Sequence, residues 1–121
     1  MRKGGAFCET YGKSIRNTVL EYLLENQALD FAVGDMAREV KISRPKAYEI
    51  IGELEKKGFV AKSRIIGKTQ LYLLNKTNPR AKLLMKSFKE CLRLVAEEHL
   101  DNHAHSAVQS SRAGLAYAKS I

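Results

Sequence analysis

The sequence contains no apolar run of about eighteen residues, the length that a membrane-spanning helix needs. Its first residues are basic and lead into two glycines and a polar stretch, without the apolar segment of a signal peptide. Only two cysteines are present, Cys8 and Cys91, and they lack CxxC spacing, so neither a zinc ribbon nor a disulfide framework is expected. These absences predict a cytoplasmic protein with reduced thiols and no membrane partner.

Signatures of catalysis are missing as well. The sequence has no phosphate-binding glycine motif, no paired carboxylates in a recognisable setting and no nucleophile with a positioned base. We therefore expect no enzymatic activity and no cofactor.

Positive charge is what the sequence has in excess. The 121 residues, 45% of them hydrophobic, suffice for one compact core plus an extension. The 21 Lys and Arg residues outnumber the 13 Asp and Glu residues, which gives a formal charge of +8. Such a charge favours polyanions, either nucleic acid or an anionic membrane surface, and does not by itself choose between them.

The N-terminal residues 1–13 show little periodicity, contain three glycines and are basic at the tip. We expect this segment to be a flexible basic arm. Ser14 can cap a first helix, because its hydroxyl can accept a hydrogen bond from a free backbone amide. Apolar residues then recur at helical spacing until the helix ends near Asn26 and Gln27. The stripe consists of Ile15, Val19, Leu20, Tyr22, Leu23 and Leu24.

A short apolar link over 29–33 leads to Gly34 and Asp35, which precede a second helix of about two turns. Its apolar positions are Met36, Ala37 and Val40. The next helix follows almost at once, so two helices are expected to meet across a tight turn.

This third helix is expected over about 43–57. Ser43 can cap it, and Pro45 is tolerated because backbone donors in a first turn have no intrahelical partner. Gly58 is expected to end the helix in the left-handed conformation. The apolar face consists of Ala47, Ile50, Ile51 and Leu54, and the opposite face is free to contact another molecule.

Two β-prone runs, 59–66 and 69–74, are joined by Gly67 and Lys68, a pair that suits a tight hairpin. Two strands alone are marginally stable, so we expect the hairpin to pack on the helices. The alternation does not decide which set faces inward, Phe59, Val60, Leu71 and Leu73 or Tyr72 and Leu74. Residues 14–76 are thus predicted to form one helix-helix-helix-hairpin domain.

A long helix is predicted over 77–100, because Asn78 caps well and Pro79 is preorganised for a first helical turn. Its apolar surface is larger than one small domain can cover, so it either wraps its own domain or mediates dimerisation. We favour a dimerisation helix whose contacts come from Ala81, Leu84, Phe88, Cys91, Leu92 and Val95. Residues 101–121 are expected to be a weakly ordered tail or a short helix.

Residues 34–49 and 54–60 form the most telling pattern. They look like the positioning helix, turn, recognition helix and first wing strand of winged helix-turn-helix DNA-binding regulators. Over residues 14–76 the chain resembles the small archaeal and bacterial proteins akin to the MarR and ArsR families. The resemblance implies a mainly α fold with a small β-hairpin (α+β), a winged helix-turn-helix with a long C-terminal dimerisation helix.

The resemblance also implies that the helix over 43–57 lies in the major groove of duplex DNA. The wing over about 64–70 then contacts the backbone or the minor groove. DNA contacts are expected from Ser43, Arg44, Pro45, Lys46, Tyr48, Glu49 and Lys56 on the helix and from Lys62, Arg64, Lys68 and Thr69 on the wing. Glu49 would repel the backbone unless it accepts from a cytosine amino group or pairs with Lys46. The alternatives are a solvated helix face and a hairpin edge that lysine protects from aggregation.

His99, His103 and His105 lie close to Asp101 in the sequence and suggest a metal sensor of the ArsR-like kind. Their spacing gives this weak support, and no metal site is predicted. A redox switch through the cysteines is a further possibility. One of these thiols lies on an apolar stripe, where burial disfavours the thiolate, and the thiol on the arm is expected to be more exposed but has no activating neighbour.

These features predict a sequence-specific, double-stranded DNA-binding transcriptional regulator that acts as a homodimer, with repression the favoured mode and the effector unknown. The alternatives are a DNA-binding partition or architectural protein and a winged-helix protein-protein interaction module. The basic residues on the third helix and the wing favour nucleic acid, because an adaptor would more plausibly show a neutral or apolar face.

Overall fold

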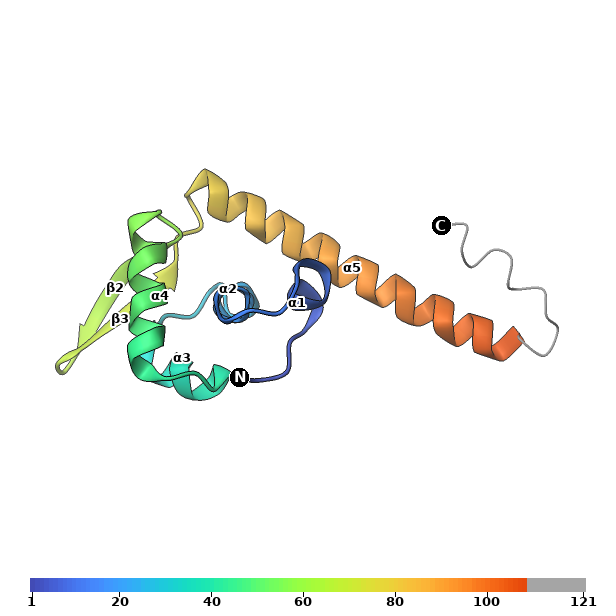
Figure 1. Ribbon diagram of the computed structural model, residues 1–121. Coiled ribbons are helices and arrows are strands. Elements are labelled where there is room, and N and C mark those ends of the chain that lie inside the picture. The colour runs from blue at the N-terminus through green and yellow to red at the C-terminus, as the bar shows by residue number, and fades with distance from the viewer. Residues whose placement is uncertain (109–121) are drawn as a thin grey trace.

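The computed structural model describes the backbone of residues 1–108 and the side chains of residues 1–101. In chain order the elements are α1 (Ala6–Tyr11), α2 (Ile15–Glu25), β1 (Phe31–Ala32), α3 (Val33–Val40), α4 (Arg44–Lys56), β2 (Val60–Ile66), β3 (Thr69–Leu74) and α5 (Pro79–Val108). Helix α4 and the β2–β3 hairpin lie at one end of the molecule, and α5 extends past α1 to the opposite side (Figure 1). The arrangement is the expected α+β fold, a winged helix-turn-helix with a long C-terminal helix.

Local residues set the start of three helices, as expected. The Ser14 hydroxyl accepts a hydrogen bond from the backbone amide of Asn17 at 3.0 Å, which caps α2. Helix α4 is capped by Ser43, and α5 by Asn78, whose side-chain oxygen accepts from the amides of residues 80 and 81 at 2.8 and 3.0 Å. These caps satisfy amides that have no partner inside the helix.

The end of α4 is set by Gly58, which adopts the left-handed conformation with φ of 82°. The Gly58 amide donates to the carbonyl of Glu55 at 3.0 Å, and the Phe59 amide donates to the carbonyl of Leu54 at 2.9 Å. This pair of bonds is the Schellman motif, which satisfies the last carbonyls of a helix. The expected stop is thus confirmed, and the chain turns directly into β2.

The sheet has the strand order β1-β3-β2 and is antiparallel throughout. Its third strand, β1, lies within the segment expected to be only an apolar link, and pairs Phe31 with Tyr72. The hairpin turn is Gly67 and Lys68, between the paired residues Ile66 and Thr69. Neither alternating set faces inward as a whole, because the buried hairpin residues are Val60, Leu71 and Leu74. A register shift between residues 62 and 65 marks a bulge in β2, which is an edge strand.

The flexible arm expected over residues 1–13 is not present. Residues 6–11 form α1, and both Phe7 and Cys8 are buried, with 3% and 5% of their surface exposed. The short helix packs against α2 and α5. The expectation that Cys8 is an exposed thiol is therefore wrong, and the N-terminal segment belongs to the folded core.

The C-terminal helix also differs from expectation. It continues to Val108, beyond the predicted end at residue 100, and the remainder of the expected tail lies outside the described residues. Three predicted dimerisation residues, Ala81, Phe88 and Cys91, belong to the chain's own core. The first part of α5 therefore closes its own domain, and the rest extends beyond it. No helix among the described residues is both long and apolar enough to cross a membrane.

Candidate nucleic-acid interface

The turn between α3 and α4 sets the angle of the helix-turn-helix. Lys41 adopts the left-handed conformation with φ of 61°, which is unusual for a residue with a side chain. The Ile42 amide donates to the carbonyl of Ala37 at 3.0 Å, and this closes the end of α3. Ser43, two residues after Lys41, caps the start of α4. The two helices therefore meet across a tight turn, as predicted.

Helix α4 presents two different faces. Its buried residues are Ala47, Ile50, Ile51 and Leu54, which is the predicted set. Arg44, Pro45, Tyr48, Glu49 and Lys56 are exposed on the remaining surface. About half of the Tyr48 surface is accessible, although the side chain is large and aromatic. An aromatic and basic face of this kind is free to contact another molecule.

Three predicted contact residues at the start of α4 are engaged within the chain. The Ser43 hydroxyl accepts from the Lys46 amide at 3.2 Å, so its oxygen serves as the helix cap. The ammonium of Lys46 lies 3.3 Å from Oε1 of Glu49, which is the pairing that the sequence suggested. The Lys46 and Glu49 side chains are 41% and 57% exposed, and such a solvent-exposed pair is weak in water. A phosphate or a base edge can therefore compete for the Lys46 ammonium.

A cleft of about 540 Å³ lies between the start of α3, the start of α4 and the wing. It brings together four predicted contact residues, Arg44 and Tyr48 from α4 with Lys68 and Thr69 from the hairpin. These residues are up to 25 positions apart in the sequence, and the fold places them around one concave surface. Lys56 and Lys62 are exposed but do not line this cleft.

The cleft also contains residues that the sequence analysis missed. Arg38 lines it and is three-quarters exposed, although it forms an ion pair with Asp35 on the same helix. Its place opposite the apolar positions of α3 was a signal in the sequence. Gly34 lies under the guanidinium of Arg44, since a Cβ at Gly34 would lie 3.1 Å from Cζ of Arg44. Glycine thus lets Arg44 lie close to the backbone of α3.

In the wing, Arg64 is held by a carboxylate. Its Nε donates to Oδ2 of Asp30 at 2.9 Å, and its terminal nitrogen donates to Oδ1 at 3.4 Å. The Ser63 hydroxyl donates to the same carboxylate at 2.7 Å. The hydrogen bonds from Arg64 and Ser63 lower the pKa of Asp30, and the bond to Asp30 raises the pKa of Arg64. Arg64 is therefore paired, although its side chain is exposed, as are those of Lys62 and Lys68.

The tip of the wing carries two exposed aliphatic side chains that the sequence analysis did not single out. Ile65 and Ile66 expose 65% and 54% of their surface next to the turn residues. Exposing these apolar side chains to water is unfavourable, so water alone does not account for their position at the tip. An apolar wing tip beside a lysine suits contact with a partner surface.

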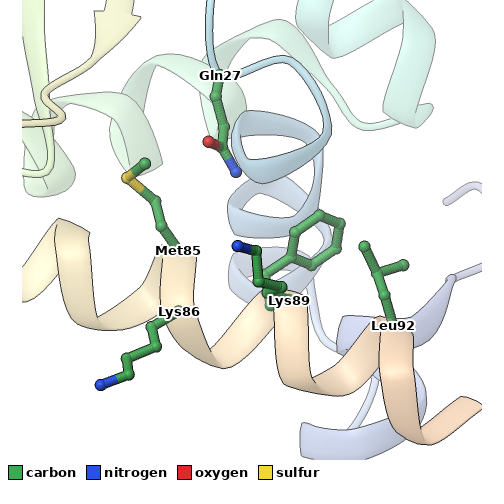
Figure 2. Close-up of a pocket in the computed structure, with 6 residues that line it drawn as sticks. Gln27, Met85, Lys86, Lys89 and Leu92 are labelled. Atoms are coloured by element: carbon green, nitrogen blue, oxygen red, sulfur yellow. The ribbon is translucent and has the colours of Figure 1, made fainter.

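The distal half of α5 exposes apolar side chains as well. Leu92, Leu94 and Leu100 are exposed beyond the point where the helix leaves the core. An apolar groove of about 400 Å³ lies between this helix and the end of α2. Figure 2 shows Met85 and Leu92 directed from α5 toward the side of Gln27, whereas Lys86 turns away. Of the predicted dimerisation residues, Leu92 is exposed, and Leu84 and Val95 are half-buried.

The metal and redox hypotheses gain no support from the described side chains. In that part of the chain, no three His, Cys, Asp or Glu residues are grouped as metal ligands. His103 and His105 lie outside the residues whose side chains are described. Both thiols are free and buried, and burial, followed by the charge of Glu21, raises the pKa of Cys8.

Residues 18–77 match the family model for the sugar-specific transcriptional regulator TrmB. The matched range covers most of α2, β1, the helix-turn-helix and the wing. The sequence has no significant match among curated proteins.

Several solved structures share the fold at low sequence identity. MepR, a transcription regulator of the Staphylococcus aureus multidrug efflux pump MepA, gives a TM-score of 0.61 at 15% identity, covering 95% of this chain and 85% of that chain. The S. aureus MepR–DNA complex gives 0.57 at 15% identity, with coverage of 86% and 84%. The homodimeric winged helix-turn-helix DNA-binding domain of Mb0332 from Mycobacterium bovis, a possible ArsR-family regulator, gives 0.51 at 22% identity, with coverage of 83% for each chain. The chain is thus a winged helix-turn-helix protein with the architecture of these transcriptional regulators.

Proposed function

We propose that this protein is a sequence-specific, double-stranded DNA-binding transcriptional regulator that acts as a homodimer. The observation that carries the proposal is the cleft in which Arg44 and Tyr48 of α4 lie beside Lys68 and Thr69 of the wing. The net charge of +8 favours a polyanionic partner for such a surface. The MepR–DNA complex, which shares the fold, supports the same partner.

The first half of α4 is proposed to enter the major groove. Arg44 and Lys46 have donors that suit O6 and N7 of guanine, and Tyr48 offers an exposed ring to the thymine methyl group or the sugar. The wing residues Lys68 and Thr69 then contact phosphates, which fixes the register of the protein without reading the sequence. Specificity thus comes from α4, and much of the affinity comes from charge.

Dimerisation is proposed to occur through the part of α5 that extends beyond the core. Leu92, Leu94 and Leu100 are exposed there, and a second copy of the chain would remove them from water. A two-fold dimer presents two α4 helices to half-sites about 34 Å apart on one side of the duplex. The homodimeric Mb0332 domain supports this assembly. Occupying an operator that overlaps a promoter then suffices for repression.

The first experiment selects bound fragments from a random-sequence duplex pool and measures affinity for the winner by fluorescence anisotropy. Arg44→Ala should weaken binding to the selected duplex by about 1–3 kcal/mol, which corresponds to an increase in Kd of between about fivefold and 150-fold. Binding to random duplex should be weakened much less. Lys13→Ala is the matched control, because Lys13 is exposed after α1 and its loss removes the same charge.

Two results would contradict the proposal. One is the absence of duplex binding at low salt, because a protein with this charge should bind nonspecifically even where its operator is unknown. The other is an equal loss for Arg44→Ala and Lys13→Ala on selected and random duplex, which would remove α4 from the interface. Sedimentation equilibrium tests the dimer separately, and promoter run-off transcription tests repression.

A further inference from the structure

The N-terminal segment connects the helix-turn-helix to the long helix. Residues 1–5 run from the end of α3 to the start of α1, and α1 lies against α5 (Figure 1). At one end the Arg2 amide donates to the carbonyl of Val40, the last residue of α3, at 2.9 Å. At the other end Tyr11, the last residue of α1, is hydrogen-bonded to Ser87 of α5. One short segment therefore contacts both the helix-turn-helix and α5, whose relative orientation must be fixed in a DNA-binding dimer.

This segment is fixed to the core by a buried carboxylate. Glu21 of α2 is fully buried, and its oxygens accept from the Gly5 amide at 2.9 and 3.0 Å and from the Cys8 amide at 3.0 Å. Gly5 is the N-cap residue of α1 and supplies no capping side chain, so Glu21 takes that role from another helix. A buried carboxylate without such donors would be costly. The hydrogen bonds from the Gly5 and Cys8 amides to Glu21 therefore favour the observed position of the N-terminal segment over others.

The two glycines allow the close approach. A Cβ at Gly4 would lie 2.6 Å from Cβ of Cys8, and a Cβ at Gly5 would lie 3.3 Å from Oε2 of Glu21. A side chain at Gly4 would clash with Cys8 of α1, and a side chain at Gly5 would press on the Glu21 carboxylate of α2. The glycine pair, from which the sequence analysis expected flexibility, thus serves tight packing.

Arg2 joins three carboxylates from two helices. Its guanidinium lies 3.6 Å from Glu21 and 2.8 Å from Glu25, both on α2, and 3.9 Å from Glu39 on α3. Only 18% of the side chain is exposed, and its Nε is buried without a hydrogen-bond partner among the described residues. A partly desolvated arginine among three carboxylates gains more from charge than a surface pair does.

We propose that Arg2 and Glu21 are positioning residues that hold α3, and with it α4, at a fixed orientation to α5. They would thereby set the half-site spacing that the dimer accepts. The inference rests on the proposed function. Neither residue lines the cleft between α4 and the wing, so their loss should leave the contacts to a single half-site in place. What changes is the angular freedom between the DNA-binding end and the dimerisation helix.

The test compares Arg2→Ala with Lys3→Ala in the full chain. Lys3 is the exposed neighbour and carries the same charge. The probes are the selected operator, the same half-sites with about five base pairs inserted between them, and a single half-site. For the wild type and Lys3→Ala, the insertion should cost about a hundredfold in affinity, because the half-sites then face opposite sides of the duplex. For Arg2→Ala the cost should fall below about tenfold, with the affinity for a single half-site unchanged.

A second measurement does not depend on DNA. Spin labels at Lys57→Cys and Glu98→Cys report the distance between the end of α4 and α5, because both native thiols are buried. Labelled chains are diluted with unlabelled protein so that the signal comes from within one chain. Arg2→Ala should broaden the distance distribution, and so should Glu21→Gln, which keeps the shape of the side chain but removes its charge.

An unchanged distance distribution in folded Arg2→Ala overturns the inference, and so does an unchanged spacing preference. If the wild type binds no duplex DNA, the proposed function fails, and the spin-label distances still decide whether Arg2 and Glu21 fix the orientation.

Discussion

The wing arginine offers the sharpest perturbation of the proposed interface. In the free protein Arg64 is held by Asp30, with Nε to Oδ2 at 2.9 Å and a second contact at 3.4 Å. The substitution Asp30→Asn removes the competing carboxylate and raises the formal charge from +8 to +9. Arg64 then becomes available to a phosphate, and we expect tighter binding to duplex DNA at low salt.

The magnitude follows from counterion release. One additional phosphate contact steepens the slope of log affinity against log salt by about 0.9. Over a fourfold change, from about 50 to 200 mM salt, this slope corresponds to a factor of about 3.5. The advantage of Asp30→Asn over the wild type should therefore shrink about 3.5-fold across this range.

Anisotropy titrations at several salt concentrations measure the effect. Glu9→Gln is the matched control, because Glu9 is exposed on α1 and its loss changes the net charge equally. The double variant Asp30→Asn/Arg64→Ala should return to the wild-type slope. The reasoning is refuted if Asp30→Asn and Glu9→Gln have the same slope. It is also refuted if Asp30→Asn binds more weakly, which would mean that the wing needs the Asp30 contact to reach DNA.

Three further predictions concern the fold and the assembly. Lys41→Gly should raise the free energy of unfolding by roughly 0.5–1 kcal/mol in urea denaturation, because glycine adopts φ of 61° without strain, whereas Lys41→Ala should bring no gain. Leu94→Glu should dissociate the dimer in sedimentation equilibrium while Leu83→Glu, at the start of α5, should not; equal effects would contradict the proposed interface. Because the pKa of Cys8 is raised, its thiolate forms only at higher pH than that of a free cysteine, so a thiol reagent should leave the folded protein unmodified at about pH 8 and react with both thiols after denaturation. Rapid modification of the folded chain would refute the burial.

The sequence alone predicted the features that depend on near neighbours. Ser43 caps α4 through an amide three positions away, and the same helix ends at Gly58 through bonds from the Gly58 and Phe59 amides to carbonyls three and five positions before them. Because these signals act within one or two helical turns, residue type and spacing are sufficient to recognise them. The apolar face of α4 was predicted for the same reason.

Contacts between distant residues could not be predicted in this way. Glu21 accepts from amides 13 and 16 positions away, and Asp30 holds an arginine 34 positions away. Nothing near Gly4 and Gly5 in the sequence distinguishes tight packing under a carboxylate from flexibility, so the segment looked like an arm. The burial of Cys8 follows from the same contacts and was missed with them.

The candidate interface was predicted in part. Arg44 and Lys68 were expected from charge and motif, and the fold places both around one cleft. That Arg64 is paired with Asp30 depends on how the wing sits on the sheet, which no local pattern encodes. The division of α5 into a core half and an exposed half likewise depends on where α1 packs.

The central claim is that the N-terminal half of α4 binds duplex DNA. The most direct measurement is a titration of ¹⁵N-labelled protein with the selected duplex, followed through backbone amide shifts. We expect the largest changes at Arg44, Lys46 and Tyr48, with a second group at Lys68 and Thr69 in the wing. Changes confined to α5, with α4 unaffected at saturating duplex, would contradict the central claim.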